Sequence, residues 1–449
     1  MTKPVSEREI VLAVLTEVLE DGRFSHVVLR SVLEKYQYLQ KKERAFITRV
    51  TEGTLEHLIE IDYILDTFSK IEVKKMKPVI RNILRSSVYQ LKYMDSVPDA
   101  AVCNEAVNLA VKKGFRSLKG FVNGLLRNVA RNLESVVYPS EGLEALSIRY
   151  SMPVWILNMW SAVYDAGSLE TMLAAFQEEM PLTIRCNQVR ATPGQLRARL
   201  EAEGVKVRQH PYLPYAFWIS GYDHLQSLKS FQEGWFSVQD VSSMLAVELS
   251  GVKEGDQVLD VCAAPGGKAL HMAEKLNQTG HVRARDLTEY KVRLIEENIR
   301  REGAANIEAA VWDAAQPEAG SADSADIVMA DVPCSGLGVL GRKTDLRYKV
   351  TPEGLEDLVR LQRKILSTVQ AYVKPGGTLM YSTCTIHSGE NEENVRWFLE
   401  HFPQFALQSL KTDVCEELRD RVDEEGWLQL LPGINKSDGF FIAKLIRRR

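Results

Sequence analysis

The sequence predicts a multidomain protein with an all-α N-terminal bundle, a small α+β middle domain and a C-terminal α/β domain built on a doubly wound, Rossmann-like sheet. At 449 residues the chain exceeds what one compact core usually holds. Helical periodicity runs through about the first 135 residues, and strand–helix alternation begins near residue 240. These changes of pattern divide the chain into expected domains at 1–140, 141–235 and 236–449.

The N-terminal region places apolar residues at helical spacing. In residues 6–22 the expected N-cap is Ser6 and the expected stop is Gly22. Later segments keep this spacing without strand-like alternation, which predicts a helical bundle. One segment adds a basic face, made of Arg116, Lys119, Arg127 and Arg131. That face is either a solvated surface or an RNA-contacting one, and the pattern alone favours neither.

Residues 180–235 change character. Short strand candidates surround one helix, expected within 192–204, and this predicts a small α+β unit. From about residue 240 onward, apolar runs alternate with amphipathic helical segments. Near-continuously apolar strands in this order indicate a parallel sheet buried on both faces. The expected strands lie within 256–264, 280–286, 306–314, 324–333 and 376–385.

Composition and charge restrict the class of protein. The chain is 45% hydrophobic and 26% charged, with a net charge of −4. A small basic excess in the first 140 residues is compatible with nucleic acid binding at that end. No apolar stretch suits a membrane span or a signal peptide, and six scattered cysteines form no CxxC pair. We therefore expect a reduced, cytoplasmic protein with no membrane contact and no metal.

Glycines and carboxylates mark a nucleotide-binding edge. A glycine turn between the first strand and its helix can present backbone N–H groups to a ligand. Asp286 ends the second strand, 26 residues after Asp260, and suits a ribose diol; Asp313 ends the third, where adenine could be read. Together these features predict an adenosine cofactor without pyrophosphate, for which S-adenosylmethionine is the natural candidate. The turn consists of Cys262, Ala263, Ala264, Pro265, Gly266, Gly267 and Lys268.

Two cysteines lie at neighbouring strand ends, Cys334 after the fourth strand and Cys384 at the end of the fifth. Beside a methyl donor, a thiolate that adds to carbon 6 of a pyrimidine makes carbon 5 nucleophilic enough to accept the methyl group. Asp331 is placed to hydrogen-bond or protonate the ring nitrogen. From the residues alone either cysteine could attack. The others, Cys103, Cys186 and Cys415, are expected to be small buried hydrophobes, and this expectation extends to Cys262 beside the glycine turn.

Several motifs, in order, resemble a known family. They are "FSVQDVSSMLAVEL", "VLDVCAAPGGK", "DVPCSGLGVL", "YSTCT" followed by "ENEENV", and "SDGFFIAKL". They resemble the RNA 5-methylcytosine methyltransferases of the RsmB/Sun (Fmu) group, within the NOL1/NOP2/Sun superfamily. The segments "YQLKYMDSVPDAAVCNEAVNLAVKKG" and "FVNGLLRNVAR" resemble the NusB-type RNA-binding domain of this group, so the resemblance covers nearly the whole chain.

The resemblance implies a cytosine of 16S ribosomal RNA as substrate, free or in early assembly, and a monomeric enzyme. It implies attack by Cys384, product release by Cys334, and cofactor contacts from Cys262–Lys268, Asp286, Asp313 and Asp331. Two departures are Val332, where alanine is more usual, and Asp286 without a second acidic residue nearby. The alternatives are a non-catalytic RNA-binding assembly factor, which the intact site disfavours, and an enzyme acting on transfer RNA, which the N-terminal helical domain disfavours.

Overall fold

The computed structural model describes residues 5–178 and 180–449, which form two compact units. Unit 1 contains the described residues up to Glu178 together with Leu340–Lys349. Unit 2 contains the described residues from 180 to Val339 together with Val350–Arg449. This division groups residues 141–178 with the helices that precede them, and it groups the small sheet with the large one. It therefore differs from the boundaries expected at 140 and 235.

Unit 1 is helical. Ser6 caps the first helix by accepting the Glu9 backbone N–H at 3.4 Å, as the sequence predicts, but that helix ends before Gly22. The apolar faces of the first seven helices share one core. The predicted helical bundle is confirmed. Its helices are α1 (Glu7–Leu19), α2 (Ser25–Lys35), α3 (Lys41–Glu56), α4 (Leu58–Phe68), α5 (Pro78–Tyr93), α6 (Asp99–Lys112), α7 (Lys119–Asn132), α8 (Gly142–Tyr150), α9 (Val154–Ser161) and α10 (Ala166–Ala175).

A late segment of the chain completes unit 1. Residues Leu340–Lys349 include a short 3₁₀ helix, Thr344–Tyr348, whose polar side chains are held inside the unit. The buried Asp345 carboxylate accepts the Ser25 backbone N–H at 3.0 Å and the Ser25 hydroxyl at 2.6 Å. The buried Arg347 guanidinium donates to the Tyr150 carbonyl at 3.1 Å. These contacts satisfy charges that burial would otherwise penalise.

The small sheet of unit 2 is antiparallel and has the strand order β2-β3-β1-β4. Helix α11 (Pro193–Ala202) packs on it through Leu196 and Leu200, and begins at a capping box in which Thr192 and Gln195 exchange hydrogen bonds. The predicted α+β unit is confirmed. The strands are β1 (Leu182–Cys186), β2 (Lys206–Gln209), β3 (Ala216–Ser220) and β4 (Phe236–Val238), with helix α12 (Lys229–Gln232) before β4.

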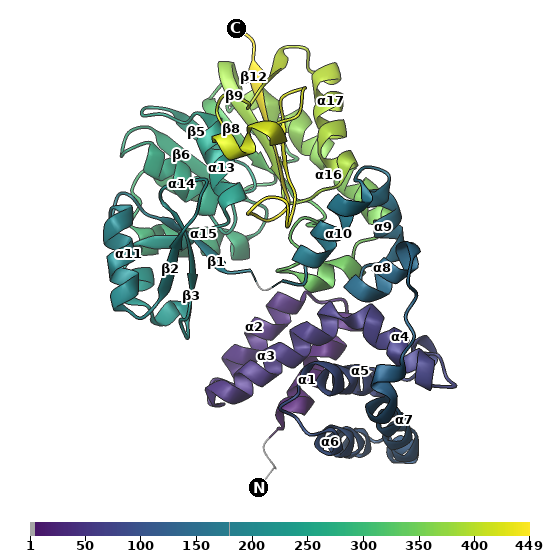
Figure 1. Ribbon diagram of the computed structural model, residues 1–449. Helices are drawn as coiled ribbons and strands as arrows, with labels where there is room; N and C mark the ends of the chain where they lie inside the picture. Colours follow the sequence, from purple (N-terminus) through teal and green to yellow (C-terminus); the bar gives the residue numbers. More distant parts are fainter. Residues whose placement is uncertain (1–4, 179) are drawn as a thin grey trace. The chain divides into compact units, whose positions relative to one another are not determined.

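The large sheet has the order β10-β12-β9-β8-β5-β6-β7, and β11 pairs with β12. Alternate strand residues enter two cores, one shared with α13, α14 and α15 and the other with α16 and α17, so both faces are covered (Figure 1). The Rossmann-like domain is confirmed. Its strands are β5 (Gln257–Asp260), β6 (His281–Asp286), β7 (Ile307–Val311), β8 (Ala325–Asp331), β9 (Val373–Thr383), β10 (Phe405–Gln408), β11 (Leu428–Leu430) and β12 (Phe440–Arg447). Its helices are α13 (Val241–Ser250), α14 (Gly267–Lys275), α15 (Glu289–Glu302), α16 (Pro352–Val369) and α17 (Glu392–His401).

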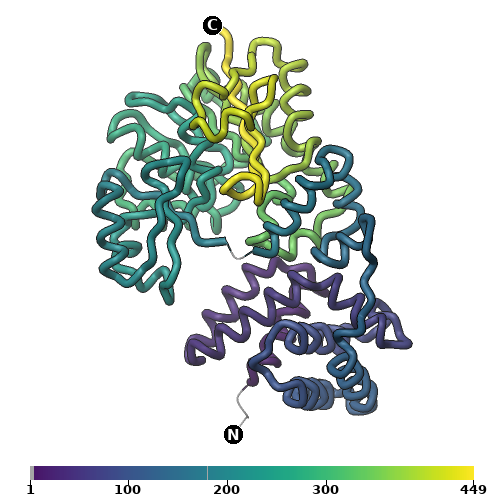
Figure 2. Tube along the Cα trace, in the orientation of Figure 1, coloured from purple at the N-terminus to yellow at the C-terminus, as the bar shows by residue number. Residues whose placement is uncertain are grey.

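The sheet is mixed, which corrects the wholly parallel sheet that the sequence predicts. The five strands β5 to β9 are parallel, but β12 is antiparallel to both β9 and β10. In Figure 2 this yellow C-terminal strand runs beside the green strand β9. The short connection from β11 to β12 holds no crossover helix, so the two strands pair antiparallel. In the described part of the chain no helix has the length and apolar character that a membrane span requires.

Candidate active site

Strands β8 and β9 bring the two predicted cysteines together. Their parallel register pairs Asp331 with Ser382, so the two carboxyl ends meet at one edge of the sheet. Just beyond this edge the sulfur atoms of Cys334 and Cys384 lie 3.2 Å apart. Fifty residues separate the cysteines in sequence, and the strand pairing alone accounts for their proximity. Either thiol can therefore act on the same small substrate group.

A buried carboxylate fixes the loop that carries Cys334. Glu390 has no exposed area and accepts the Ser335 backbone N–H at 2.9 Å and the Ser335 hydroxyl at 2.5 Å. It also accepts the Gln362 amide at 2.8 Å. A charged acceptor makes such hydrogen bonds stronger than neutral ones, so Glu390 holds the backbone next to Cys334 firmly.

Backbone contacts fix the loop that follows Cys384. The Asn391 side chain accepts the Thr383 hydroxyl at 2.5 Å and donates to the Thr385 carbonyl at 3.0 Å, on either side of the cysteine. The Gly338 N–H donates to the Cys384 carbonyl at 3.0 Å. A Cβ atom at Gly338 would lie 2.1 Å from the Gly439 carbonyl oxygen, so this position requires glycine. The segment "ENEENV", for which no role was predicted, thus supports both cysteine loops.

Lys268 and Asp331 add opposite charges to the cysteines. The Lys268 ammonium lies 2.7 Å from one Asp331 oxygen, and the other Asp331 oxygen accepts the Ser382 hydroxyl at 2.7 Å. Burial opposes the charged form of Lys268, but Asp331, Asp260 and Cys384 outweigh it and raise the Lys268 pKa. The hydrogen bond with Cys384, together with burial, raises the pKa of the Cys334 thiol well above its ordinary value. We call Lys268, Asp331, Cys334 and Cys384 the thiol site.

A cavity of about 230 Å³ adjoins the thiol site through Lys268 and Asp331. Most of the predicted glycine turn lines it, namely Cys262, Ala263, Ala264, Pro265, Gly267 and Lys268. Gly266 is not a lining residue but makes the turn possible, because its φ of +107° is strained for other residues. Five further lining residues were assigned no role from the sequence: Val238, Gln239, Asp240, Ser243 and Asp260.

Asp260 is the most perturbed carboxylate in this cavity. Burial and the neighbouring Asp331 charge raise its pKa to about 8, so it is protonated at neutral pH. Its Oδ2 atom is buried and has no hydrogen-bond partner among the described residues. The signal that could have identified Asp260 is its place at the end of β5, the same argument that selects Asp286 and Asp313.

Asp286 and Asp313 do not line the cavity. Asp286 lies at the end of β6 and accepts the Ala264 backbone N–H at 3.0 Å, so it contacts the turn directly. Asp313 follows β7, and its carboxylate accepts the Ala315 N–H of its own turn at 2.9 Å. The structure therefore brings Asp286, but not Asp313, to the residues that form the cavity.

The donor set of the cavity fits S-adenosylmethionine. Carboxylates suit the hydroxyl and ammonium groups of that molecule, and the start of α14 offers backbone N–H groups to its carboxylate. Two buried polar atoms, Asp260 Oδ2 and Gln239 Nε2, have no partner among the described residues. Residues 5–178 and 180–449 contain no group of three His, Cys, Asp or Glu side chains that could hold a metal ion.

The remaining cysteines are not part of the thiol site. Cys103 is buried in the core of unit 1 and Cys186 in that of the small sheet. Cys415 and Cys262 are partly buried and pack against the two cores of the large sheet, one on each. Burial raises the Cys186 pKa to about 12, which leaves the thiol unreactive.

Family models match three consecutive regions of the chain. Residues 5–131 match the NusB family, and residues 152–222 match the ferredoxin-like domain of RsmF/B-like methyltransferases. Residues 247–446 match the model of the 16S rRNA methyltransferases RsmB/F. The regions follow the order of the helical unit, the small sheet and the large sheet.

Curated proteins and solved structures match nearly the whole chain. A probable ribosomal RNA small subunit methyltransferase B of Bacillus subtilis is 34% identical, over 99% of this chain and 100% of its own. The ribosomal RNA small subunit methyltransferase B of Cronobacter sakazakii is 29% identical over the full length of both. The crystal structure of PH0851 aligns with a TM-score of 0.83 and 26% identity, over 99% of each chain.

Proposed function

The chain belongs to the RsmB/F family of ribosomal RNA small subunit methyltransferases, and from this we propose that it methylates carbon 5 of a cytosine in 16S ribosomal RNA through a covalent cysteine adduct. The observation that carries the proposal is the pair of thiols 3.2 Å apart beside Lys268 and Asp331. Two thiols suit a reaction in which one thiol adds to the base and the other later helps to release the methylated base. An assembly factor without activity would have no need of them.

In this proposal Cys384 is the nucleophile. Lys268, whose charge is felt at Cys384, stabilises the thiolate that adds to carbon 6 of the cytosine. The Cys334 pKa is raised, so Cys334 stays a thiol and donates a hydrogen bond to the neighbouring thiolate. The assignment of attack to Cys384 follows the family resemblance, and these electrostatics support it.

Asp331 and Lys268 hold the base. Their side chains lie 2.7 Å apart, and in the proposal Asp331, once protonated, donates a hydrogen bond to the ring nitrogen of cytosine. This contact disperses the charge that develops when the thiolate adds. When bound, S-adenosylmethionine supplies an electrophilic methyl group. Residues Cys262–Lys268, with Asp286, Asp313 and Asp331, are the proposed contacts to it.

After methyl transfer, the proton on carbon 5 must leave before the Cys384–carbon 6 bond can break. We assign this step to Cys334, whose sulfur lies next to that of Cys384. Once Cys384 is bonded to carbon 6, the Cys334 thiol loses its own proton to water, and the resulting thiolate accepts the carbon 5 proton. As the proton leaves, its C–H electron pair forms the carbon 5–carbon 6 double bond and expels the Cys384 thiolate. Loss of Cys334 should therefore stop the reaction at the adduct.

The test is a denaturing gel of protein incubated with 16S RNA and S-adenosylmethionine. Cys334→Ala should form an adduct that survives denaturation, and Cys384→Ala should form none and methylate no RNA. Methylation by Cys384→Ala would overturn the cysteine assignment. Bisulfite sequencing of ribosomal RNA from a deletion strain tests the substrate, because one protected cytosine should become convertible.

A further inference from the structure

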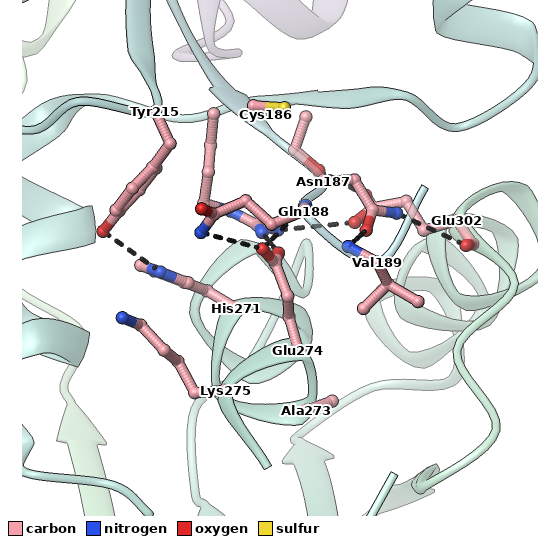
Figure 3. A network of polar contacts seen from close by, with 12 residues as sticks. Cys186, Asn187, Gln188, Val189, Tyr215, His271, Ala273, Glu274, Lys275 and Glu302 are labelled. Carbon is pink, nitrogen blue, oxygen red and sulfur yellow. Dashed lines mark hydrogen bonds and ion pairs between the residues drawn. The ribbon is translucent and has the colours of Figure 1, made fainter. Parts of the chain in front are cut away.

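The buried arginine of the small sheet contacts a residue of the cofactor cavity. Arg185, at the end of β1, has no exposed area and forms ion pairs with Glu274 of α14 and Glu302 of α15. Figure 3 shows both glutamates among polar contacts with Asn187 and Gln188: the Gln188 N–H donates to Glu274, and the Asn187 amide donates to the Glu302 carbonyl. The Arg185 Nε–H is directed elsewhere and donates to Gln239 Oε1 at 2.8 Å. We call Arg185, Glu274 and Glu302 the arginine network.

This contact decides which way the Gln239 amide is turned. Arginine is only a donor, so the atom that faces Arg185 must be the amide oxygen. The Nε2 donor then points away from Arg185, is buried, and has no acceptor among the described residues. Gln239 as a whole is 6% exposed and lines the cavity. A buried donor without an acceptor costs free energy, which indicates that a ligand supplies the acceptor.

The surroundings of Gln239 explain why the protein itself provides no acceptor. A Cβ atom added to Gly267 would lie 3.6 Å from Gln239 Cδ and 3.9 Å from Nε2, so the amide lies against the start of α14. The first turn of a helix presents unpaired N–H groups and no free carbonyls. The Gln239 amide and the α14 N-terminus therefore form a group of donors with no acceptor between them.

The charges around the cavity select the ligand group for these donors. Its other walls carry the carboxylates of Asp240 and Asp331 and the protonated Asp260, and the single lining ammonium, Lys268, is already paired with Asp331. A carboxylate is repelled by the acidic walls and attracted by the helix N-terminus. S-adenosylmethionine carries one carboxylate, on its amino-acid moiety.

We propose that Gln239 Nε2 donates a hydrogen bond to the α-carboxylate of S-adenosylmethionine, and that Arg185 is the positioning residue that orients this amide. The proposal rests on the proposed function only in taking S-adenosylmethionine as the ligand. It assigns to the small sheet a part in cofactor binding, because β1 supplies Arg185. It also gives the "FSVQD" segment, which carries Gln239, a chemical role.

The test compares two ligands that differ only in the carboxylate: S-adenosylmethionine and its decarboxylated form. Both are titrated calorimetrically into the full-length protein without RNA. Gln239→Met should weaken S-adenosylmethionine about 10- to 100-fold, as expected for one hydrogen bond to a charged group, and decarboxylated ligand less than about threefold. Arg185→Lys keeps the charge but loses the Nε–H, and should show a smaller loss with the same ligand dependence.

Gln188→Met is the matched control. The Gln188 side-chain amide donates to Glu274 at 3.5 Å in the same network but does not line the cavity, so this variant should bind both ligands as the wild type does. If Gln239→Met does not fold, Gln239→Glu replaces it; this variant keeps the acceptor for Arg185 and should repel only the carboxylated ligand. Equal losses for the two ligands would overturn the inference. Failure of the wild type to bind S-adenosylmethionine would instead contradict the proposed function.

Discussion

Helix α14 contributes to two buried polar clusters that are built in opposite ways. Its first turn supplies Lys268 to the thiol site, and its last turns supply Glu274 to the arginine network. In the arginine network each carboxylate is paired with the guanidinium. Beside the thiol site, Asp260 Oδ2 and Gln239 Nε2 are buried without partners. The arginine network is complete within the protein, whereas the polar groups beside the thiol site are completed by a ligand.

The acid–base behaviour around α14 follows the same division. Glu248 of α13 lies beside the last turns of α14. Burial opposes its ionisation, but hydrogen bonds from His271, Lys275 and Tyr215 outweigh this effect and lower its pKa to about 2. On the cavity side of α14, the Cys262 N–H and the Lys268 charge compensate Asp260 only in part, and burial with the Asp331 charge raises its pKa to about 8. Partner supply, rather than burial alone, thus decides whether a carboxylate beside α14 is charged.

The largest effect on stability is expected when the arginine network is broken. Arg185→Met leaves Glu274 and Glu302 buried without their cation, and should lower the free energy of unfolding by about 3–5 kcal/mol in urea denaturation. Arg300→Met, on the exposed face of α15, is the control and should change it by less than about 0.5 kcal/mol. A loss below about 1 kcal/mol for Arg185→Met would contradict a structural role for the network.

The second prediction tests whether the thiol site depends on Glu390, which holds the loop that carries Cys334. Glu390→Gln removes the charge that holds Ser335, so Cys334 and its loop lose their fixed position. Release of methylated RNA from the adduct in a single turnover should slow by about 10- to 100-fold, while cofactor affinity stays within about twofold. Glu393→Gln, exposed on the following helix α17, should leave both unchanged. Equal rates for the two variants would show that the loop does not depend on Glu390.

Because its pKa is raised, Asp260 should make the free energy of unfolding depend on pH. Its folded pKa of about 8 lies above the ordinary 3.8, so the folded state retains a proton that the unfolded state loses between these values. Its stabilising contribution is full below pH 4 and is lost as pH rises through 8, by at most ~1.4 kcal/mol per pH unit. The free energy of unfolding, measured from pH 5 to pH 8.5, should fall more in the wild type than in Asp260→Asn. Parallel pH profiles would contradict the raised pKa.

The smallest effect is expected at the surface. Lys291 pairs with Asp286 at 2.9 Å, but its side chain is 47% exposed and water screens the pair. Lys291→Met should therefore change the free energy of unfolding by less than about 1 kcal/mol. Thermal melts at low and high salt are the measurement, and a larger, salt-dependent loss would place this pair with the buried clusters.

Local patterns predicted much of the fold because each residue in them depends on its near neighbours. Apolar runs and helical spacing gave all five parallel strands, and the strand ends gave the meeting of Cys334 with Cys384. The place of β12 was missed, because pairing direction depends on contacts with β9 and β10 that no local pattern contains. The buried Arg185, Arg347 and Glu390 were missed for a related reason. A charged residue in sequence predicts exposure, and only a distant partner makes its burial possible.

The segment that completes unit 1 constrains how the chain is made. A ribosome releases the first 178 residues well before it reaches Leu340, and domains usually fold as they emerge. Until then Ser25 and the Tyr150 carbonyl have no Asp345 and Arg347 to bind. The N-terminal helices therefore reach their final packing only after strands β5 to β8 have been synthesised. A nascent chain stopped before residue 340 therefore lacks the segment that completes unit 1 as well as the C-terminal strands of unit 2.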